Sequence, residues 1–397
     1  MVSDEPLASV ASRLACRADE LAETFLRQLR STVRAYDAVS DDDLRRSLKR
    51  NVARVVAAIE QHEQLPPDIE EDERATGKRR ALQGIPSESV VDAYRSHLSA
   101  LRDAFIDEAV SADLDPQTVL TGTLRLWDLT DKYTNVLIIA HHEAELDAAR
   151  RDEQRRLAFL QRLLTGGLEP AELQEGGAVL GVLANTEYWV FRGRQHDGAT
   201  HRLTRHLETC SPGSHVKPLV GPVDADVSGI STSRPRQLDG AVVAVAGPAD
   251  ISAIPGAFAE ATRVLHAALR YQRTGIVDSS SLSVRIAVEQ QAELGEFLFR
   301  RYITAMSDRG AMGAEILDTV RSWIQQRRSI AATARSLSIH DNSVRYRIAR
   351  FCEVTGADLD DSDSLVEVWW ALEYASIRQS AQSSRPGPSA RTPSIHE

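Results

Sequence analysis

The sequence predicts a multidomain protein of mixed class, in which all-α parts flank a middle part of α/β or α+β type. The chain has 397 residues, which is longer than a domain with a single hydrophobic core usually is. This length corresponds to about two to four domains. In the first third and near the C-terminal end, apolar residues recur at three- and four-residue steps, the spacing of amphipathic helices. Between Ala178 and Val277 they change to β-branched runs separated by Gly, Pro and Ser, which is typical of strands and turns.

The first third reads as an all-α bundle. One amphipathic helix runs from Leu44 to Ile59, with Ser40 and Asp43 at its start. Segment 66–80, rich in proline and charge, is predicted to break the helical pattern, which resumes at about residue 87. A third run, 119–139, continues into a long helix with a heptad pattern at Leu146, Arg150, Glu153, Leu157, Leu160 and Leu164. This helix is expected either to pair with its twin in a dimer or to be a solvated single helix.

The middle part is expected to contain a sheet. Residues 178–184, 187–193 and 241–247 read as strands, and residues 252–272 read as a helix. A helix-rich segment then leads to the terminal module. The last residues, rich in Ser and Pro and poor in apolar side chains, are expected to be disordered.

The terminal module has the pattern of a helix-turn-helix. A helix with Ile316, Val320 and Trp323 on one face precedes a short helix that buries Ala334 and Leu337. Residues 338–340 form the expected turn, and Asp341 or Asn342 is expected to cap the next helix. That helix buries Val344, Ile348 and Phe351 and leaves a polar, arginine-rich face outside. Two short helices joined by such a turn are typical of DNA-binding domains.

Local charge favours the same interpretation. The whole chain has a net charge of -10, which argues against a protein that coats nucleic acid over its entire surface. Residues 321–350, however, contain seven Arg and one acid, so this segment is +6 and the rest of the chain is -16. A solvated helix face is the alternative interpretation. The expected DNA-binding residues are Asn342, Ser343, Arg345 and Tyr346 near bases, Arg347 and Arg350 on the backbone, and Ser329 and Thr333 before them.

The segment 317–375 resembles the C-terminal helix-turn-helix of PucR/CdaR-type bacterial transcriptional regulators. The residues that carry the resemblance are His340, Asn342, Ser343, Tyr346, Arg347, Gly356, Asp358 and Leu359. The resemblance implies that the helix from about Asn342 to Phe351 is the recognition helix. Asp341 departs from the pattern, in which a basic residue commonly follows the histidine.

The rest of the chain resembles the same regulators. Residues 75–109 are similar to the RsbRD-like N-terminal domain, which implies a globin-like bundle without haem. Residues 247–270, followed by 275–282, are similar to a degenerate GGDEF-like domain. Cyclase activity is not implied, because the sequence lacks the G-G-[DE]-E-F loop.

These resemblances imply a cytoplasmic, sequence-specific transcriptional regulator, an activator by family expectation. Its partners would be double-stranded DNA, a second copy or a higher homo-oligomer, and an unknown small-molecule effector, with no membrane. The alternative is an RsbRD-like signalling adaptor that acts through protein contacts. The expected parts are 1–145 (sensor or dimerisation domain), 146–168 (linker helix), 169–285 (GGDEF-like), 286–380 (helix-turn-helix) and 381–397 (tail).

No enzyme activity, cofactor or metal is expected. Cys16, Cys210 and Cys352 form no metal-binding or disulfide spacing. Four other groups have simpler interpretations than a functional site. His141 and His142 are expected on a solvated helix face and not as metal ligands, and Ser279–Ser281 is expected to start a helix and not to be a nucleophile segment. His62 and His97 are not expected to be haem ligands, because the resembled domain lacks haem, and Trp369 and Trp370 are not expected to form a ligand site. The two tryptophans are expected to close the core of the terminal module, on a helix begun by a capping box of Ser364 and Glu367.

Overall fold

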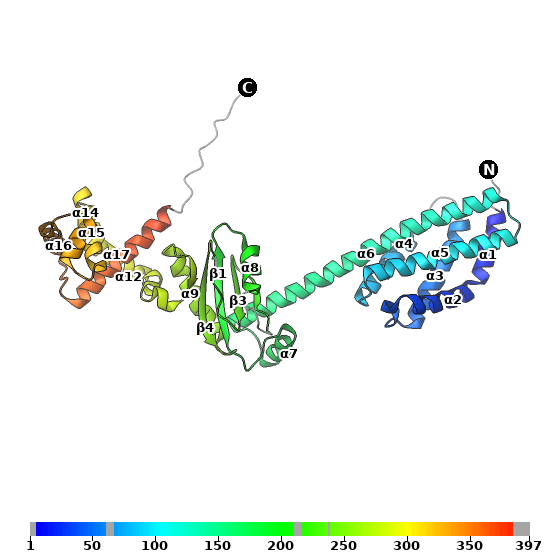
Figure 1. Cartoon of the computed structure of the whole chain (residues 1–397), viewed down its shortest axis with the longest axis horizontal. Coiled ribbons are helices and arrows are strands. Elements are labelled where there is room, and N and C mark those ends of the chain that lie inside the picture. The colour runs from blue at the N-terminus through cyan, green and yellow to red at the C-terminus, as the bar shows by residue number, and fades with distance from the viewer. Residues whose placement is uncertain (1–4, 61–66, 210–215, 237–238, 384–397) are drawn as a thin grey trace, which may run out of the picture. The chain divides into compact units, whose positions relative to one another are not determined.

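The computed structural model describes residues 5–60, 67–209, 216–236 and 239–383 (Figure 1). His62, Cys210 and the tail beyond residue 383 lie outside the described residues. The chain divides into two compact units, Met1–Gln154 and Arg155–Glu397. Helices flank a mixed sheet, so the fold class predicted from the sequence, multidomain α and α+β, is confirmed. Within the described ranges, no helix combines the length and apolar character needed to cross a bilayer.

The N-terminal unit is a helical bundle around one apolar core. Its elements are α1 (Glu5–Cys16), α2 (Ala18–Thr32), the 3-10 helix η1 (Arg34–Tyr36), α3 (Asp41–Glu60), α4 (Pro67–Leu82), α5 (Ser87–Ser111) and the first part of α6 (Pro116–Thr165). Helix α3 begins as expected, because the Ser40 hydroxyl accepts a hydrogen bond from the Asp43 amide at 3.3 Å.

Helix α4 corrects the prediction that segment 66–80 is a break. Its buried face is polar, with Glu73, Thr76 and Arg80 inside the unit, so the apolar periodicity that marks most helices is missing. Arg54 of α3 pairs with the Glu73 carboxylate, and Arg80 donates to Asp43 at 2.7 Å. Gly77 lets α4 approach α6 closely, since an added Cβ would lie 2.3 Å from the Leu137 carbonyl oxygen.

Helix α6 is continuous over 50 residues, as the unbroken pattern predicted. In the N-terminal unit it buries Leu126, Leu129, Tyr133 and Leu137 in the core. Its later residues Leu160, Leu163 and Leu164 belong to the apolar core of the second unit.

The second unit is built on a five-stranded sheet of order β2-β3-β1-β4-β5. The strands are β1 (Tyr188–Gln195), β2 (Leu219–Val223), β3 (Asp226–Ser231), β4 (Ala241–Ala249) and β5 (Gly275–Val277). All neighbours are antiparallel except β4 and β5, which are parallel. Helix α9 (Ile254–Arg270) packs on one face and α8 (Thr200–Glu208) on the other (Figure 1).

The predicted strand 178–184 is wrong. Its first residues end helix α7 (Pro170–Leu180), and Gly181 follows in the left-handed region at φ 75°. Glu169 and Glu172 form a capping box, and Pro170 occupies the first turn, so strong local signals start a helix here. A short apolar run by itself does not distinguish a strand from a buried helix.

The remaining helices follow the last strand, and most of them surround an apolar core of their own. They are α10 (Ser279–Leu282), α11 (Arg285–Gln290), α12 (Ala292–Leu298), the π-helix η2 (Phe299–Thr304), α13 (Ala305–Ser307), α14 (Gly310–Gln325), α15 (Ile330–Leu337), α16 (Asp341–Thr355) and α17 (Ser362–Ser383). The first two instead place Leu282 and Ile286 in the core beneath the sheet. Ser279–Ser281 start α10 after the cap Asp278, in agreement with the structural interpretation.

Candidate nucleic-acid interface

Helices α15 and α16 form the predicted helix-turn-helix. Helix α15 begins at Ser329, whose hydroxyl accepts a hydrogen bond from the Ala332 amide at 3.3 Å. It ends at Ser338, which lies in the left-handed region at φ 56°. The Ile339 amide then donates to the Ala334 carbonyl at 3.0 Å, as in a Schellman motif. This motif ends α15 sharply and leaves residues 338–340 as the turn.

The cap of α16 is His340, which corrects the expectation of Asp341 or Asn342. The His340 Nδ1 atom accepts a hydrogen bond from the Asn342 amide at 3.1 Å, and its backbone is extended. An Nδ1 atom that accepts carries no hydrogen, and the His340 side chain is exposed at the start of the helix.

The inner face of α16 is anchored in the core of the module. Val344 and Phe351 are completely buried, and Ile348 packs against the same core, as predicted. The ring of Phe351 stacks on Tyr302 with centroids 6.4 Å apart. These contacts fix the rotation of α16 about its axis, and they thereby determine which side chains face outward.

The outer face carries most of the predicted contact residues. Asn342, Arg345 and Tyr346 are exposed, and Tyr346 is 62% accessible. Ser343 is partly buried. Arg350 donates to Glu353 one turn further on at 2.5 Å, and this carboxylate raises the pKa of Arg350. The exposed arginine, tyrosine and amide side chains thus lie together near the start of α16.

Arg347 and Thr333 differ from the expectation. The Arg347 guanidinium forms an ion pair with Glu315 and donates to the Thr319 hydroxyl at 3.2 Å, so it ties α16 to α14. Thr333 is completely buried, and its hydroxyl donates to the Ser329 carbonyl at 2.8 Å. Thr333 therefore does not face the outer surface, whereas Ser329 is exposed at the start of α15.

The turn before α15 holds a feature that sequence reasoning missed. Arg327 and Arg328 both have positive φ, at 54° and 64°, and both are exposed. Such backbone conformations are uncommon for residues other than glycine. The turn has no glycine or proline that would have indicated it. This turn therefore exposes the guanidinium groups of Arg327 and Arg328 directly before Ser329, at the start of α15.

His141 corrects the expectation of a solvated helix face. It is buried and joins the Ile85 carbonyl through Nε2 at 2.8 Å, whereas His142 is exposed. The residues that the structure describes contain no cluster of three or more metal-binding side chains. Trp370 packs against the core of the terminal module, as expected. The predicted capping box of Ser364 and Glu367 is wrong.

The start of α17 is instead stabilised by an aspartate. The Asp361 carboxylate accepts from the Ser364 amide at 2.9 Å. Glu367, which the capping box would have required at the helix start, accepts from the Tyr302 hydroxyl at 2.5 Å. The Ser364 amide therefore bonds Asp361, and the Glu367 carboxylate bonds the buried Tyr302. Ser364 and Glu367 do not form the predicted pair.

Two known domain families match parts of this chain. Residues 19–156 match the RsbT co-antagonist protein rsbRD N-terminal domain, and residues 316–374 match the PucR C-terminal helix-turn-helix domain. The second range contains α15, α16 and all of the outer face described above. The two matches confirm the resemblances inferred for these regions, and both domains are named for regulators and not for enzymes.

Two similar proteins add context. A curated protein of Thermomonospora curvata, described as an uncharacterized protein in the pkwA 5' region, is 43% identical over 54 residues, 14% of this chain. The match spans only 30% of the length of that relative. The crystal structure of a regulator of polyketide synthase expression from Bifidobacterium adolescentis aligns with 56% of this chain and 92% of its own, at 21% identity and a TM-score of 0.23.

Proposed function

We propose that this chain, with its RsbRD-type start and its PucR-type helix-turn-helix, is a sequence-specific transcriptional regulator that places α16 in the major groove of DNA. The observation that carries the proposal is the division of α16 into two faces. Val344 and Phe351 are buried, while Asn342, Arg345 and Tyr346 are exposed together. A helix anchored in this way presents its outer side chains to a groove as a rigid set.

The chemistry of the outer face suits base and phosphate contacts. A guanidinium such as that of Arg345 can donate two hydrogen bonds to guanine, and the amide of Asn342 can pair with adenine. Arg350 and Ser329 are proposed to contact phosphates, together with the free amide groups at the start of α15. Arg347 contributes mainly by holding α16 on α14, because its guanidinium bonds both Glu315 and Thr319 of that second helix, whereas the partner of Arg350 lies on α16 itself.

The regulator is proposed to act as a homodimer in the cytoplasm. One recognition helix covers few base pairs, and two copies space their helices about one DNA turn apart. The exposed apolar side chains of α6, Leu120, Leu124 and Trp127, support pairing through this helix. A GGDEF-like middle domain would transmit the response to an effector, with activation of transcription as the expected outcome. The domain limits given above belong to this proposal.

A signalling adaptor remains the second candidate. The RsbRD-type match over residues 19–156 and the exposed apolar residues of α6 favour it. An adaptor would carry out its function through protein contacts alone. It would therefore show no sequence preference among DNA fragments.

Selection of genomic DNA fragments by the full-length protein, followed by sequencing, tests the proposal. A regulator enriches a small set of fragments that share a motif, and its binding weakens steeply as salt rises. Arg345→Ala is expected to cost about 1 to 3 kcal/mol of binding free energy and to relax discrimination at one base. The matched control is Arg273→Ala, which removes an exposed arginine after α9 and should leave binding unchanged. Wild-type protein that enriches no fragment would contradict the proposal.

A further inference from the structure

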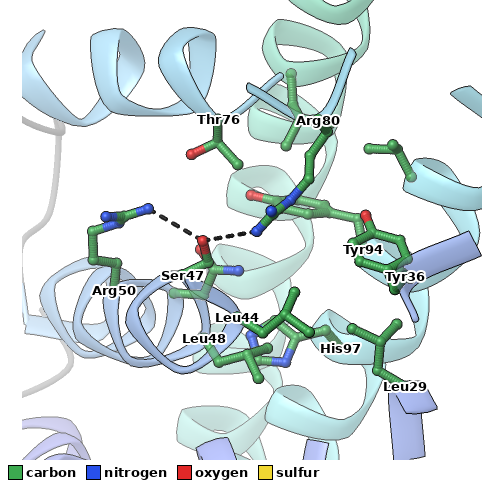
Figure 2. A pocket seen from close by; sticks show the side chains of 14 residues that line it. Leu29, Tyr36, Leu44, Ser47, Leu48, Arg50, Thr76, Arg80, Tyr94 and His97 are labelled. Carbon is green, nitrogen blue, oxygen red and sulfur yellow. Dashed lines mark hydrogen bonds between the residues drawn. The ribbon is translucent and has the colours of Figure 1, made fainter. Parts of the chain in front are cut away.

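The N-terminal unit contains a cavity that the DNA-binding proposal does not use (Figure 2). It lies among η1, α3, α4 and α5, with Leu29 of α2 and Leu137 of α6 at its margin. Its volume is about 60 Å³. A single water needs roughly 10 to 15 Å³, so the cavity has space for several waters or for one small organic molecule.

The cavity has a polar side and an apolar side. Figure 2 shows the guanidinium groups of Arg50 and Arg80 converging on the Ser47 hydroxyl, to which they donate at 3.3 Å and 3.2 Å. Leu44 and Leu48 lie on the opposite side, next to His97. A small molecule with one charged end and one apolar end would match this division.

His97 is the unexplained group of the cavity. It is 5% exposed, and neither of its ring nitrogens has a hydrogen-bond partner within the described chain. The ring packs edge-on against Phe25 at 4.4 Å, so its orientation is fixed. Burial lowers the pKa of His97 to about 3, which leaves a neutral ring with one donor and one acceptor. Buried polar groups nearly always have partners, and a bound molecule would supply one here.

The charges around the cavity leave a place for an anion. Among the described residues, two ion-pair clusters border this site: Arg79 and Arg80 pair with Asp43, and Arg50 and Arg54 pair with Asp72 and Glu73. The first cluster has one excess positive charge, and the second is balanced. Arg80 makes three hydrogen bonds, to Asp43, Gln83 and Ser47, whereas a guanidinium has five N–H donors. Donors remain for a further acceptor.

We propose that this cavity binds a short-chain monocarboxylate of two to four carbons. Its carboxylate receives hydrogen bonds from Arg50 and Arg80, its carbon chain lies against Leu44 and Leu48, and His97 supplies a hydrogen bond from the enclosed side. A planar guanidinium is well suited to a carboxylate. The size of the cavity excludes larger acids unless the unit opens.

Sodium propionate tests the proposal with the full-length protein in the absence of DNA. Propionate should raise the unfolding temperature by about 2 to 4 °C at saturation, relative to sodium chloride at equal ionic strength. Calorimetric titration should give a dissociation constant in the millimolar range or below. Propionamide, which has the same shape and no charge, should have no effect.

Two variants make the test specific. His97→Phe keeps an aromatic ring against Phe25 and removes both nitrogens, so it should fold and lose the response to propionate. His142→Phe changes an exposed histidine of the same unit, 67% accessible at its side chain, and should keep the response. The arginines are unsuitable for substitution, because Arg80→Met would leave the buried carboxylate of Asp43 with fewer partners.

Every outcome of the propionate measurements either supports or overturns the proposed site. Stabilisation of wild type and His142→Phe, together with loss in His97→Phe, supports the site. A response that persists in His97→Phe, a response to propionamide alone, or none at all would overturn it and leave a cavity that holds water. The measurement involves no DNA, so failure of DNA binding and failure of this site are observed separately.

Discussion

The buried imidazole of His97 makes a quantitative prediction about acid stability. In the folded protein burial lowers the pKa of His97 from 6.5 to about 3. Between these values the unfolded chain holds a proton that the folded chain lacks. The folded state therefore loses stability as pH falls below 6.5. The loss is about 1.4 kcal/mol for each pH unit, and lowering the pH from 7 to 5 should cost roughly 2 kcal/mol at this residue alone.

Comparison of wild type with His97→Phe at pH 7 and pH 5 isolates this contribution. Hydrogen exchange of peptides from α5 measures the opening free energy of this part of the unit separately from the rest of the chain. Guanidinium groups lining the cavity do not change charge in this range, and the variant shares every other titrating group. The wild type should lose about 2 kcal/mol more than the variant. Equal losses in both proteins would show that His97 is not held neutral by burial, and the reasoning would be refuted.

Three further predictions concern the second unit. Arg347→Ala should cost at most about 1 kcal/mol of stability, since Glu315 is largely exposed. It should also weaken DNA binding less than Arg345→Ala does in a fluorescence anisotropy titration. An equal or larger loss of binding would mean that Arg347 leaves Glu315 for DNA. Asp226→Asn weakens the ion pairs of the buried Asp226 carboxylate with Arg192 and Arg194 of β1. It should lower the free energy of unfolding, measured with denaturant, by about 3 kcal/mol, and a negligible change would contradict this. Ser338→Gly should raise stability by about 0.5 to 1 kcal/mol, because Ser338 has positive φ, and a lower unfolding temperature would argue against strain there.

The sequence was informative where burial follows apolar periodicity. Val344, Ile348 and Phe351 were predicted as the inner stripe of α16, and all three pack in the core of the module. Periodicity failed for α4, whose inner face consists of paired polar groups such as Glu73 and Arg80. A buried ion pair has no signature in a single sequence, because its two members lie far apart along the chain.

The site itself was only partly predictable. The exposure of Asn342, Arg345 and Tyr346 follows from their positions opposite the apolar stripe. The pairing of Arg347 with Glu315 depends on how α14 packs against α16, which is tertiary information. The cap by His340 also required coordinates, because histidine is uncommon as an N-terminal cap and two better candidates follow it.

The continuity of α6 has a mechanical consequence. Leu137 borders the cavity, and Leu160, 23 residues later on the same helix, belongs to the core that supports the sheet. At 1.5 Å per residue this is on the order of 35 Å of unbroken helix. Insertion of a single residue after Glu145 would therefore rotate every later side chain of α6, Leu160 included, by about 100° about the helix axis relative to Leu137.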